Sequence, residues 1–481
     1  MKQPNIILIF SDQHNPMVCG YEGDQFARTP NLDRLADNGT RLRNCYCASP
    51  LCVPSRTSLL TGLLPTHTGV FNNRQALASD IPTVAHSLTI AGYETVLCGR
   101  MHFLGPDQRH GFQKRLVGDF TCNRLGVPNP SMTNWEETTG QTRAGIQRSG
   151  AGNTNVMEYD KAVIGAALQQ IKDSAEDEKP LFMTIGLYGP HCPFVCPKDL
   201  FDYYYDILRS PSCPEDFLGT AHPAVRKWFA NRDMLEFEKD EVRRSRAAYY
   251  GLVEINDRHV GTIIDQAKAY LDLENTVIIY ASDHGDMIGH NGLFWKTNFY
   301  EGSARVPVIV SQPGRIAKGR VITHPTSLLD FPATLIDIAG ASQLPETDGE
   351  SWYSDLISET YQHRDRAVIS MLGDVKGDNP SAMIRKGNWK LVRHYGYDDV
   401  QLFDLEKDPA EQNDLGKNDN FCEIRRQLDA ELTEYWQGNL VAGIIDQANK
   451  RTAIQQQYAK LTEAPEDAEV WRGNLADNWL C

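Results

Sequence analysis

The chain has 481 residues, of which 41% are apolar, and its 48 basic and 63 acidic residues give a net charge of −15. This size predicts one large domain and a smaller second one, and the acidic balance excludes nucleic acid and anionic membranes as expected partners, because both need a basic contact surface. No apolar run approaches the roughly 20 residues that span a bilayer. The start Met1-Lys2, followed at once by a strand-like segment, predicts a cytoplasmic protein without a leader.

The eleven cysteines are odd in number and scattered along the chain, which predicts reduced, partly buried thiols rather than a disulfide framework. Cys45 with Cys47, and Cys192 with Cys196, are spaced closely enough to be considered as zinc pairs. Neither has a companion pair at zinc-site spacing, so we do not expect zinc at these positions.

Short apolar runs typical of buried strands recur along the first 310 residues. They cover residues 5–10, 94–98, 181–187, 276–281 and 306–310. Amphipathic stretches at helical spacing lie between them, at residues 83–91, 159–171 and 243–270. This alternation predicts an α/β fold in which a mostly parallel sheet carries helices on both faces.

Two segments interrupt the alternation and are predicted to be insertions over the site. Residues 118–156 are rich in Gly, Asn, Thr and Pro, and a plain surface loop explains them equally well. Residues 196–240 carry the aromatic run Tyr203 to Tyr205, Trp228 and Phe229. We expect the aromatic side chains of this second insertion to pack against another part of the protein.

The pattern changes after about residue 365. Short strands at 381–384, 389–392 and 401–404 indicate a small antiparallel sheet, followed by a helix over 423–437 and by a charged helix and tail from Lys450. The sequence therefore predicts a catalytic domain over residues 1–365. A smaller α+β subdomain is expected over residues 366–481.

Polar residues follow four of the expected strands, at residues 11–14, 99–102, 188–191 and 282–286. Open α/β sheets bind ligands at the carboxyl ends of their strands. We therefore expect these four clusters to meet at one edge of the sheet.

The segment from Cys52 to Gly62 places a thiol, a proline and an arginine close together. Pro54 fixes one backbone angle, and Ser55 and Thr57 are capping types, so Cys52 is expected at a helix N-terminus. The exposed amides there favour a thiolate or a bound oxyanion, and Arg56 adds a fork of donors. The segment predicts a reactive centre for an anion such as sulfate or phosphate.

Asp12, Asp283 and His284 offer oxygen and nitrogen atoms from two strand ends. A divalent cation would allow these groups to lie together without repulsion between the carboxylates. Taken singly, each is better explained as a cap or turn residue.

The segment Cys52-x-Pro54-Ser55-Arg56, with Leu60-Thr61-Gly62, resembles the signature C-x-P-S-R-x-x-x-L-T-G of the type I sulfatases, which belong to the alkaline phosphatase superfamily. The resemblance implies an alkaline phosphatase-like fold and a sulfuric ester hydrolase. It also implies that a dedicated maturation enzyme converts Cys52 to formylglycine, whose hydrated aldehyde attacks sulfur.

The same resemblance implies a set of site residues. Asp12, Cys52, Asp283 and His284 would hold a divalent cation, usually calcium, with manganese as an alternative because Gln13 stands where many sulfatases have a second aspartate. The implied catalytic residues are Cys52, Arg56, Arg100, His102, His191 and Lys296. Arg100 and His102 lie in a variant of the family's G-K-x-H motif, and His191 and Lys296 match the positions that bind sulfate and protonate the leaving oxygen.

The sequence is most similar to choline sulfatase-like members, and aromatic residues for a choline pocket could come from Trp135, Trp228 or Tyr203 to Tyr205. The substrate stays open among choline sulfate, sulfated sugars and aryl or steroid sulfates. Two alternatives to a sulfatase remain: a phosphonate monoester or phosphodiester hydrolase on the same scaffold, and a non-catalytic binding protein. The C-terminal helical stretch is compatible with an oligomer.

Overall fold

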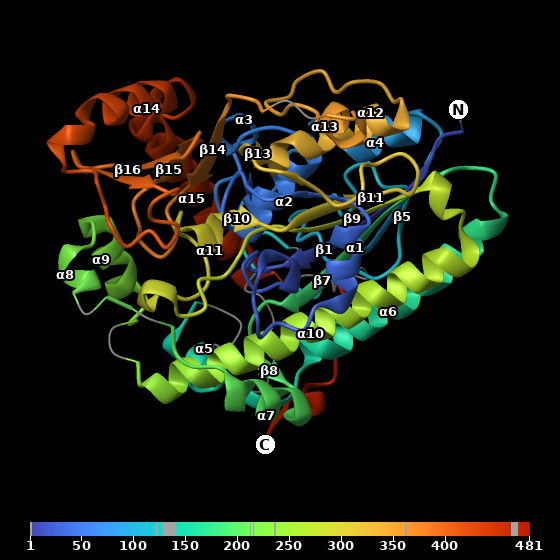
Figure 1. The fold of residues 1–481 in the computed structure, drawn as a ribbon, viewed down its shortest axis with the longest axis horizontal. Helices are drawn as coiled ribbons and strands as arrows, with labels where there is room; N and C mark the ends of the chain where they lie inside the picture. Colours follow the sequence, from blue (N-terminus) through green and yellow to red (C-terminus); the bar gives the residue numbers. More distant parts are fainter. Residues whose placement is uncertain are drawn as a thin grey trace.

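An eight-stranded sheet forms the centre of the molecule, in the strand order β12-β2-β11-β9-β1-β7-β4-β5 (Figure 1). The structure is a computed structural model that describes residues 2–121, 124–127, 141–211, 213–214, 216–234, 237–360, 363–462 and 470–481. The strands are β1 (Asn5–Asp12), β2 (Thr40–Leu42), β4 (Glu94–Gly99), β5 (Lys114–Arg115), β7 (Leu181–Pro190), β9 (Thr276–Ser282), β11 (Val308–Ser311) and β12 (Arg320–Ile322).

Of these eight strands only β11 runs opposite to the others, so the expected mostly parallel sheet is confirmed. The strand expected over 306–310 is divided at Pro307, which lacks the N–H that a sheet ladder needs. Its first part is β10 (Arg305–Val306), which pairs with β3 (Cys45–Tyr46) in a three-stranded sheet completed by β13 (Thr326–Ser327).

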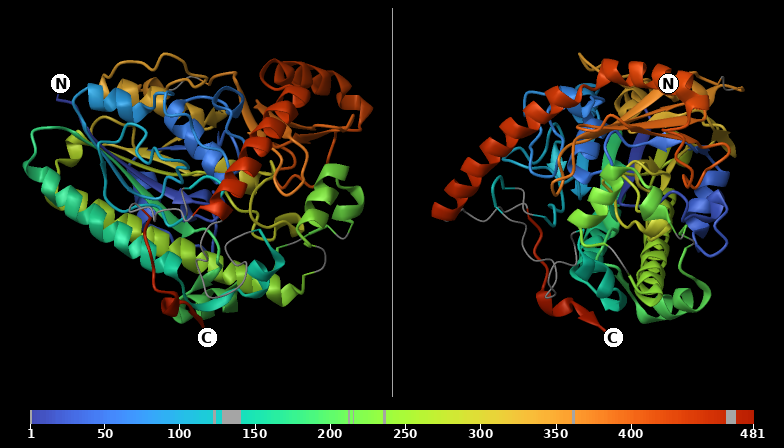
Figure 2. Two further views of the ribbon diagram at one scale, coloured as in Figure 1. Left: turned by 180° about the vertical axis from the view of Figure 1, so that it is seen from behind. Right: turned by 90° about the vertical axis from the view of Figure 1, so that its left-hand side faces the viewer.

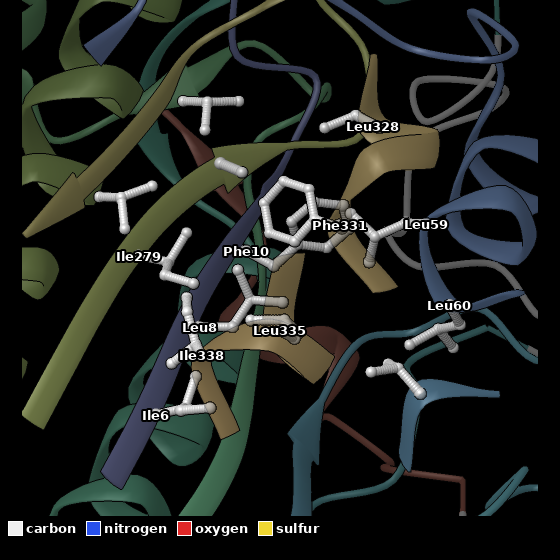
Figure 3. Close-up of a cluster of buried hydrophobic side chains, with 14 of the residues drawn as sticks. Ile6, Leu8, Phe10, Leu59, Leu60, Ile279, Leu328, Phe331, Leu335 and Ile338 are labelled. Carbon is white, nitrogen blue, oxygen red and sulfur yellow. The ribbon is translucent and has the colours of Figure 1, made fainter. Parts of the chain in front are cut away.

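Alternate residues of β1 enter two different cores, because successive side chains of a strand point to opposite faces. Ile6, Leu8 and Phe10 pack with α2 (Cys52–Thr61), α4 (Val84–Ile90) and α12 (Phe331–Ala339), as Figure 3 shows for part of this core. Ile7 and Ile9 pack with α1 (Pro30–Asp37), α6 (Asn155–Asp173) and α10 (Lys239–Tyr270). Burial on both faces explains why the strands read as continuous apolar runs.

The three predicted helices of this domain are present as α4, α6 and α10, and the last two lie side by side along one face of the sheet (Figure 1). Both begin earlier than predicted, at Asn155 and Lys239. Their first turns carry acidic residues that suit a helix N-terminus, and Glu238 and Glu241 form a capping box on α10. Short helices α3 (Pro65–Thr68), α11 (Glu301–Ala304) and α13 (Tyr353–Ile357) complete the domain, and none of the described helices is long and apolar enough to cross a membrane.

The second insertion folds into α7 (Lys198–Ile207), α8 (Phe217–Thr220) and α9 (Pro223–Asn231). Tyr204, Trp228 and Phe229 are buried in a core shared with α10, which confirms that these aromatics pack, whereas Tyr203 stays partly exposed. The described part of the first insertion holds α5 (Arg143–Gln147) and β6 (Gly150–Asn153), and β6 pairs with β8 (Val195–Cys196) and β18 (Trp479–Leu480).

A four-stranded antiparallel sheet follows in the C-terminal part, with strands β14 (Ala367–Leu372), β15 (Ser381–Lys386), β16 (Trp389–His394) and β17 (Val400–Asp404). The helix α14 (Cys422–Tyr435) packs on it, so the predicted small sheet and helix are confirmed, with β14 as an additional strand. The last long helix, α15 (Gly438–Leu461), begins before Lys450 and extends away from the small sheet (Figure 2). The domain boundary after residue 365 stays a prediction.

Candidate active site

Four adjacent strands of the large sheet, β9, β1, β7 and β4, end in the polar clusters singled out in the sequence. Because these strands are parallel, their carboxyl ends lie at one edge. Asp283 and His284 follow β9, Asp12 ends β1, His191 follows β7, and Arg100 with His102 follows β4.

Cys52 is the first residue of α2, as predicted, and it is only 1% exposed. The expected side-chain cap is wrong, because the N-cap residue is Leu51 and makes no side-chain hydrogen bond. The Ser55 hydroxyl instead donates to the backbone oxygen of Asp283 at 2.5 Å. This bond ties the start of α2 to the end of β9 and so places the thiol over the edge of the sheet.

The Cys52 thiol lies close to a histidine nitrogen and a carboxylate oxygen. Its Sγ is 3.2 Å from Nε2 of His284 and 3.8 Å from Oδ1 of Asp12. Burial alone would raise the pKa of Cys52, but the positive charges of Lys296 and His284 outweigh it and hold the pKa well below its usual value. The position therefore stabilises a negative charge.

Arg56 joins the two carboxylates beneath the thiol. Its Nε donates to Oδ2 of Asp283 at 2.8 Å, and its second terminal nitrogen lies 3.2 Å from Oδ2 of Asp12. Burial and the nearby Asp12 carboxylate raise the pKa of Asp283 despite Arg56. Burial and the nearby Cys52 would raise the pKa of Asp12 as well. The positive charges of Arg100, His191 and Arg56 outweigh them and lower this pKa below its usual value. The two buried carboxylates, Asp12 and Asp283, therefore repel each other when both are ionised.

Arg100 is fixed by two carboxylates. Its Nε is 2.5 Å from Oδ2 of Asp12, a terminal nitrogen is 3.1 Å from Oδ1 of Asp119, and the other terminal nitrogen is 2.8 Å from Nδ1 of His102. The guanidinium also lies over the Tyr188 ring, 4.4 Å from its centroid. Asp119 was not predicted from sequence, since a lone aspartate inside a loop carries no motif.

Lys296 is buried and donates from Nζ to Oε1 of Gln13 at 2.5 Å, while Nε2 of Gln13 donates to Asp286. Burial lowers the pKa of Lys296, but the negative charges of Cys52 and Asp12 raise it above its usual value, so the amine stays protonated. Gln13 therefore holds a cation in place without adding a further negative charge to the site.

His191 has one ring nitrogen engaged, since Nδ1 lies 2.7 Å from the backbone oxygen of Cys192. The carbonyl can only accept, so Nδ1 carries the proton and Nε2 is the other functional atom. Burial and the charge of Lys296 lower the pKa of His191. Asp12 and Cys52 act in the opposite direction on this pKa but do not outweigh them.

Several residues of the site have backbone angles that side chains rarely adopt. Gln13, His102, Trp295 and Thr297 have φ values of 70°, 58°, 58° and 64°. Such conformations cost free energy and persist only where surrounding contacts impose them. Their concentration at this edge of the sheet is typical of a functional site.

The ligand atoms of Asp12, Cys52, Asp283 and His284 all lie within 4.8 Å of one another. Nδ1 of His284 is 3.1 Å from the backbone oxygen of Gly285, which directs its Nε2 toward this group. Two buried carboxylates, one with a raised pKa, together with an oriented imidazole form a donor set that fits a divalent cation.

A cavity of about 250 Å³ opens above Cys52. Arg100, His102, His191 and Lys296 line it, together with Tyr188, which belongs to the expected cluster 188–191, and Trp295, which sequence reasoning did not single out. Trp228 and Tyr203 to Tyr205 do not line it: Trp228 is buried and donates from Nε1 to Thr297, and Tyr203 packs on Arg28. Trp135 lies outside the described residues.

Comparison with known proteins agrees with this geometry. The sequence profile of the sulfatase family matches residues 4–341, and a profile described as N-sulphoglucosamine sulphohydrolase, C-terminal, matches residues 289–438. The chain is 38% identical over 434 residues to a choline-sulfatase of Rhizobium meliloti (strain 1021), covering 86% of this chain and 83% of that protein. It is 28% identical over 471 residues to an arylsulfatase of Clostridium perfringens (strain 13 / Type A), covering 89% and 94%.

Among solved structures, the phosphonate monoester hydrolase of Silicibacter pomeroyi matches with a TM-score of 0.74 at 21% identity, over 90% of this chain and 95% of that one. At this identity the likeness shows a shared fold, and it confirms the alkaline phosphatase-like architecture expected from the sequence. The profile match and the 38% identity settle the family. The chain belongs to the sulfatase family and is a hydrolase of sulfate esters.

Proposed function

We propose that the protein hydrolyses its sulfate ester to an alcohol and inorganic sulfate with a formylglycine formed from Cys52. The observation that carries this proposal is the position of Cys52, at the start of α2 and facing both His284 and Asp12. A maturation enzyme is the implied partner, since the oxidation of a cysteine to an aldehyde needs a separate catalyst. One hydroxyl group of the hydrated aldehyde attacks sulfur as the alcohol oxygen leaves, and the second hydroxyl group then loses its proton and expels inorganic sulfate, which restores the aldehyde.

The proposed cation ligands are Asp12, Asp283, His284 and the modified residue 52. A divalent cation bound there supplies positive charge next to the nucleophile and the sulfate oxygens. Calcium suits the two carboxylates, and manganese suits a set that includes the imidazole of His284. Arg56 contacts one oxygen of Asp283 and one of Asp12, and so holds both carboxylates in position for the cation.

The sulfate group is proposed to bind among the cations that line the cavity. Lys296 and His102 are the direct contacts, and Arg100, held by Asp12 and Asp119, orients His102. These groups lie in a buried site where charges act more strongly than in water. Lys296 and Arg100 supply positive charge near the sulfate oxygens, where negative charge grows in the transition state, and His102 offers its other ring nitrogen for a hydrogen bond.

His191 is the proposed donor of a proton to the leaving alcohol. In the structure its pKa is lowered by burial and by Lys296. A sulfate anion bound beside it would favour the protonated ring, because an opposite charge stabilises the charged form. With Nδ1 engaged by Cys192, Nε2 is the atom from which the proton would leave.

The direct test is hydrolysis of matched esters by protein co-produced with a formylglycine-generating enzyme. 4-Nitrophenyl sulfate and the 4-nitrophenyl monoester of phenylphosphonic acid share one leaving group and separate the two reaction classes. We expect a higher kcat/KM for the sulfate and its loss in Cys52→Ala. A higher kcat/KM for the phosphonate would favour the alternative hydrolase, and full activity of Cys52→Ala would overturn the proposal.

A further inference from the structure

Lys296 lies between two residues whose backbones have positive φ angles. Trp295 has a φ of 58° and Thr297 has a φ of 64°. A β-branched residue such as threonine strongly disfavours such angles, so contacts with other parts of the protein must impose this conformation. Thr297 is buried, and it is not one of the described residues that line the catalytic cavity. Any effect of Thr297 on the reaction must therefore pass through its neighbours.

The hydroxyl group of Thr297 is fully engaged in hydrogen bonds. It accepts from Nε1 of Trp228 at 3.0 Å and from a terminal nitrogen of Arg232 at 3.0 Å. The backbone oxygen of Lys296, at 2.6 Å, is the nearer acceptor for its proton, and Oε1 of Gln141 lies at 3.2 Å. A hydroxyl group has two lone pairs and one proton, so these bonds use its whole capacity. They fix the peptide group that joins Lys296 to Thr297.

Both donors come from the second insertion, where Trp228 lies in α9 and Arg232 is the C-cap of that helix. Arg232 is buried, and its terminal nitrogens lie 2.6 and 3.1 Å from the two carboxylate oxygens of Asp378, in the loop between β14 and β15. Its guanidinium also lies over the Trp228 ring, 4.5 Å from the centroid. These contacts hold the guanidinium in one position, so it presents a fixed donor to Thr297.

The backbone of Thr297 is tied to the segment that precedes the reactive residue. Its N–H donates to the backbone oxygen of Pro50 at 3.1 Å, two residues before Cys52. Lys296, next to Thr297, donates from Nζ to Oε1 of Gln13 at 2.5 Å and lines the cavity. Thr297 therefore connects the second insertion with the lysine and with the start of α2.

We propose that Trp228 and Arg232 are positioning residues, which hold Lys296 in place for the sulfate group through the hydroxyl of Thr297. This inference rests on the proposed contact between Lys296 and sulfate. It gives the second insertion a role in catalysis in addition to the packing of its aromatic side chains. The fixed peptide group after Lys296 keeps the amine directed into the cavity.

The test compares Thr297→Val with Thr297→Ser in protein modified at residue 52. Valine keeps the branched shape of threonine but leaves both donors without their acceptor, whereas serine keeps the hydroxyl group. We expect Thr297→Val to lower kcat/KM for 4-nitrophenyl sulfate about tenfold, as for loss of a hydrogen bond to a charged group, and to raise the Ki of inorganic sulfate by a similar factor. Thr297→Ser should stay within about twofold of the wild type in both values.

Variants of the two donors should act in the same direction. We expect kcat/KM to fall about fivefold in Trp228→Phe, which loses a neutral donor, and about tenfold in Arg232→Met, which loses a charged one. Phe229→Leu is the matched control, because Phe229 is buried beside Trp228 in the same core and has no hydrogen-bonding side chain. It should lower the melting temperature and leave kcat/KM and the Ki of sulfate unchanged.

A Lys296→Met background shows whether the effect passes through the lysine. Thr297→Val should cause little further loss there, because a positioning residue has nothing left to position. An equal loss in both backgrounds would overturn the inference, as would wild-type values in Thr297→Val or equal losses in Thr297→Ser and Phe229→Leu. Each of these results would leave the proposed function intact. Failure of wild-type protein, shown to be modified at residue 52, to hydrolyse 4-nitrophenyl sulfate would instead overturn the proposed function and the inference together.

Discussion

Lys296 donates a hydrogen bond from Nζ to Oε1 of Gln13 at 2.5 Å, and the amide of Gln13 is held on its other side by Asp286. This contact accounts for Gln13 at a position where many sulfatases have an aspartate. A neutral amide holds the lysine without placing another carboxylate next to Asp12 and Asp283. The charge of Lys296 is thereby directed into the cavity.

Removal of this contact should impair catalysis through Lys296. We expect Gln13→Leu to lower kcat/KM for 4-nitrophenyl sulfate about tenfold, the effect of losing one hydrogen bond to a charged group. Lys296→Met should lower it by about 100-fold or more, as expected for loss of a group that stabilises transition-state charge. Because Gln13 acts through Lys296, the double variant should be no slower than Lys296→Met. Multiplicative losses would show that the two residues act independently.

Binding of a cation should be visible in stability as well as in activity. Dialysis against a chelator should abolish turnover and lower the melting temperature, and added calcium or manganese should restore both, because a ligand that binds only the folded state stabilises it. Asp283→Asn should lose the calcium-dependent rise in melting temperature. Asp257→Asn is the matched control, since Asp257 is a buried carboxylate that accepts from the backbone of Leu32 in α1, remote in sequence from the cation ligands. A calcium response that survives in Asp283→Asn would place the cation elsewhere.

The core around β1 should tolerate truncation poorly. Leu8 is 1% exposed and packs between the sheet and the helices shown in Figure 3. We expect Leu8→Ala to lower the free energy of unfolding by about 3 kcal/mol, through lost apolar burial and a residual cavity. Leu461→Ala, at a leucine that is 87% exposed, should change it by less than about 0.5 kcal/mol. Urea denaturation measures both values, and equal losses would contradict the assigned core.

His14 should make stability depend on pH. Burial lowers its pKa to about 4, although its hydrogen bond to the Val18 carbonyl opposes this. In the unfolded chain a histidine has a pKa of about 6.5, so between these values the unfolded state binds a proton that the folded state does not. Stability should therefore rise with pH across this window. Going from pH 7 to pH 5 should cost the wild type about 2 kcal/mol more than it costs His14→Gln, measured by urea denaturation with excess calcium. An identical pH dependence in the two proteins would contradict this assignment.

The sequence allowed much of the fold and the inner site to be predicted, for reasons visible in single residues. Buried parallel strands read as apolar runs, so β1, β4, β7 and β9 were found, and their polar ends met at one edge. The signature beginning at Cys52 placed the thiol at a helix start because the motif fixes the local backbone. Pro307 could have indicated the break between β10 and β11, because a strand ladder needs the N–H that proline lacks.

Other site residues were beyond sequence reasoning, because their roles arise from contacts between distant segments. Asp119 acts through Arg100 from a loop without a motif, and Arg232 reaches Thr297 from the second insertion. The aromatic residues of the second insertion were correctly expected to pack, but Trp228 packs against α10 and Thr297 rather than lining the cavity. Apolar composition predicts burial without identifying the partner.

The most direct test of the proposed mechanism is mass spectrometry of the peptide that contains Cys52, using protein co-produced with a formylglycine-generating enzyme. Conversion of the thiol to the aldehyde should lower the mass at Cys52 by about 18 units, and the extent of conversion should match the fraction of enzyme that releases sulfate. A wholly unmodified thiol in a sample that hydrolyses sulfate esters at full rate would contradict a formylglycine nucleophile at this position.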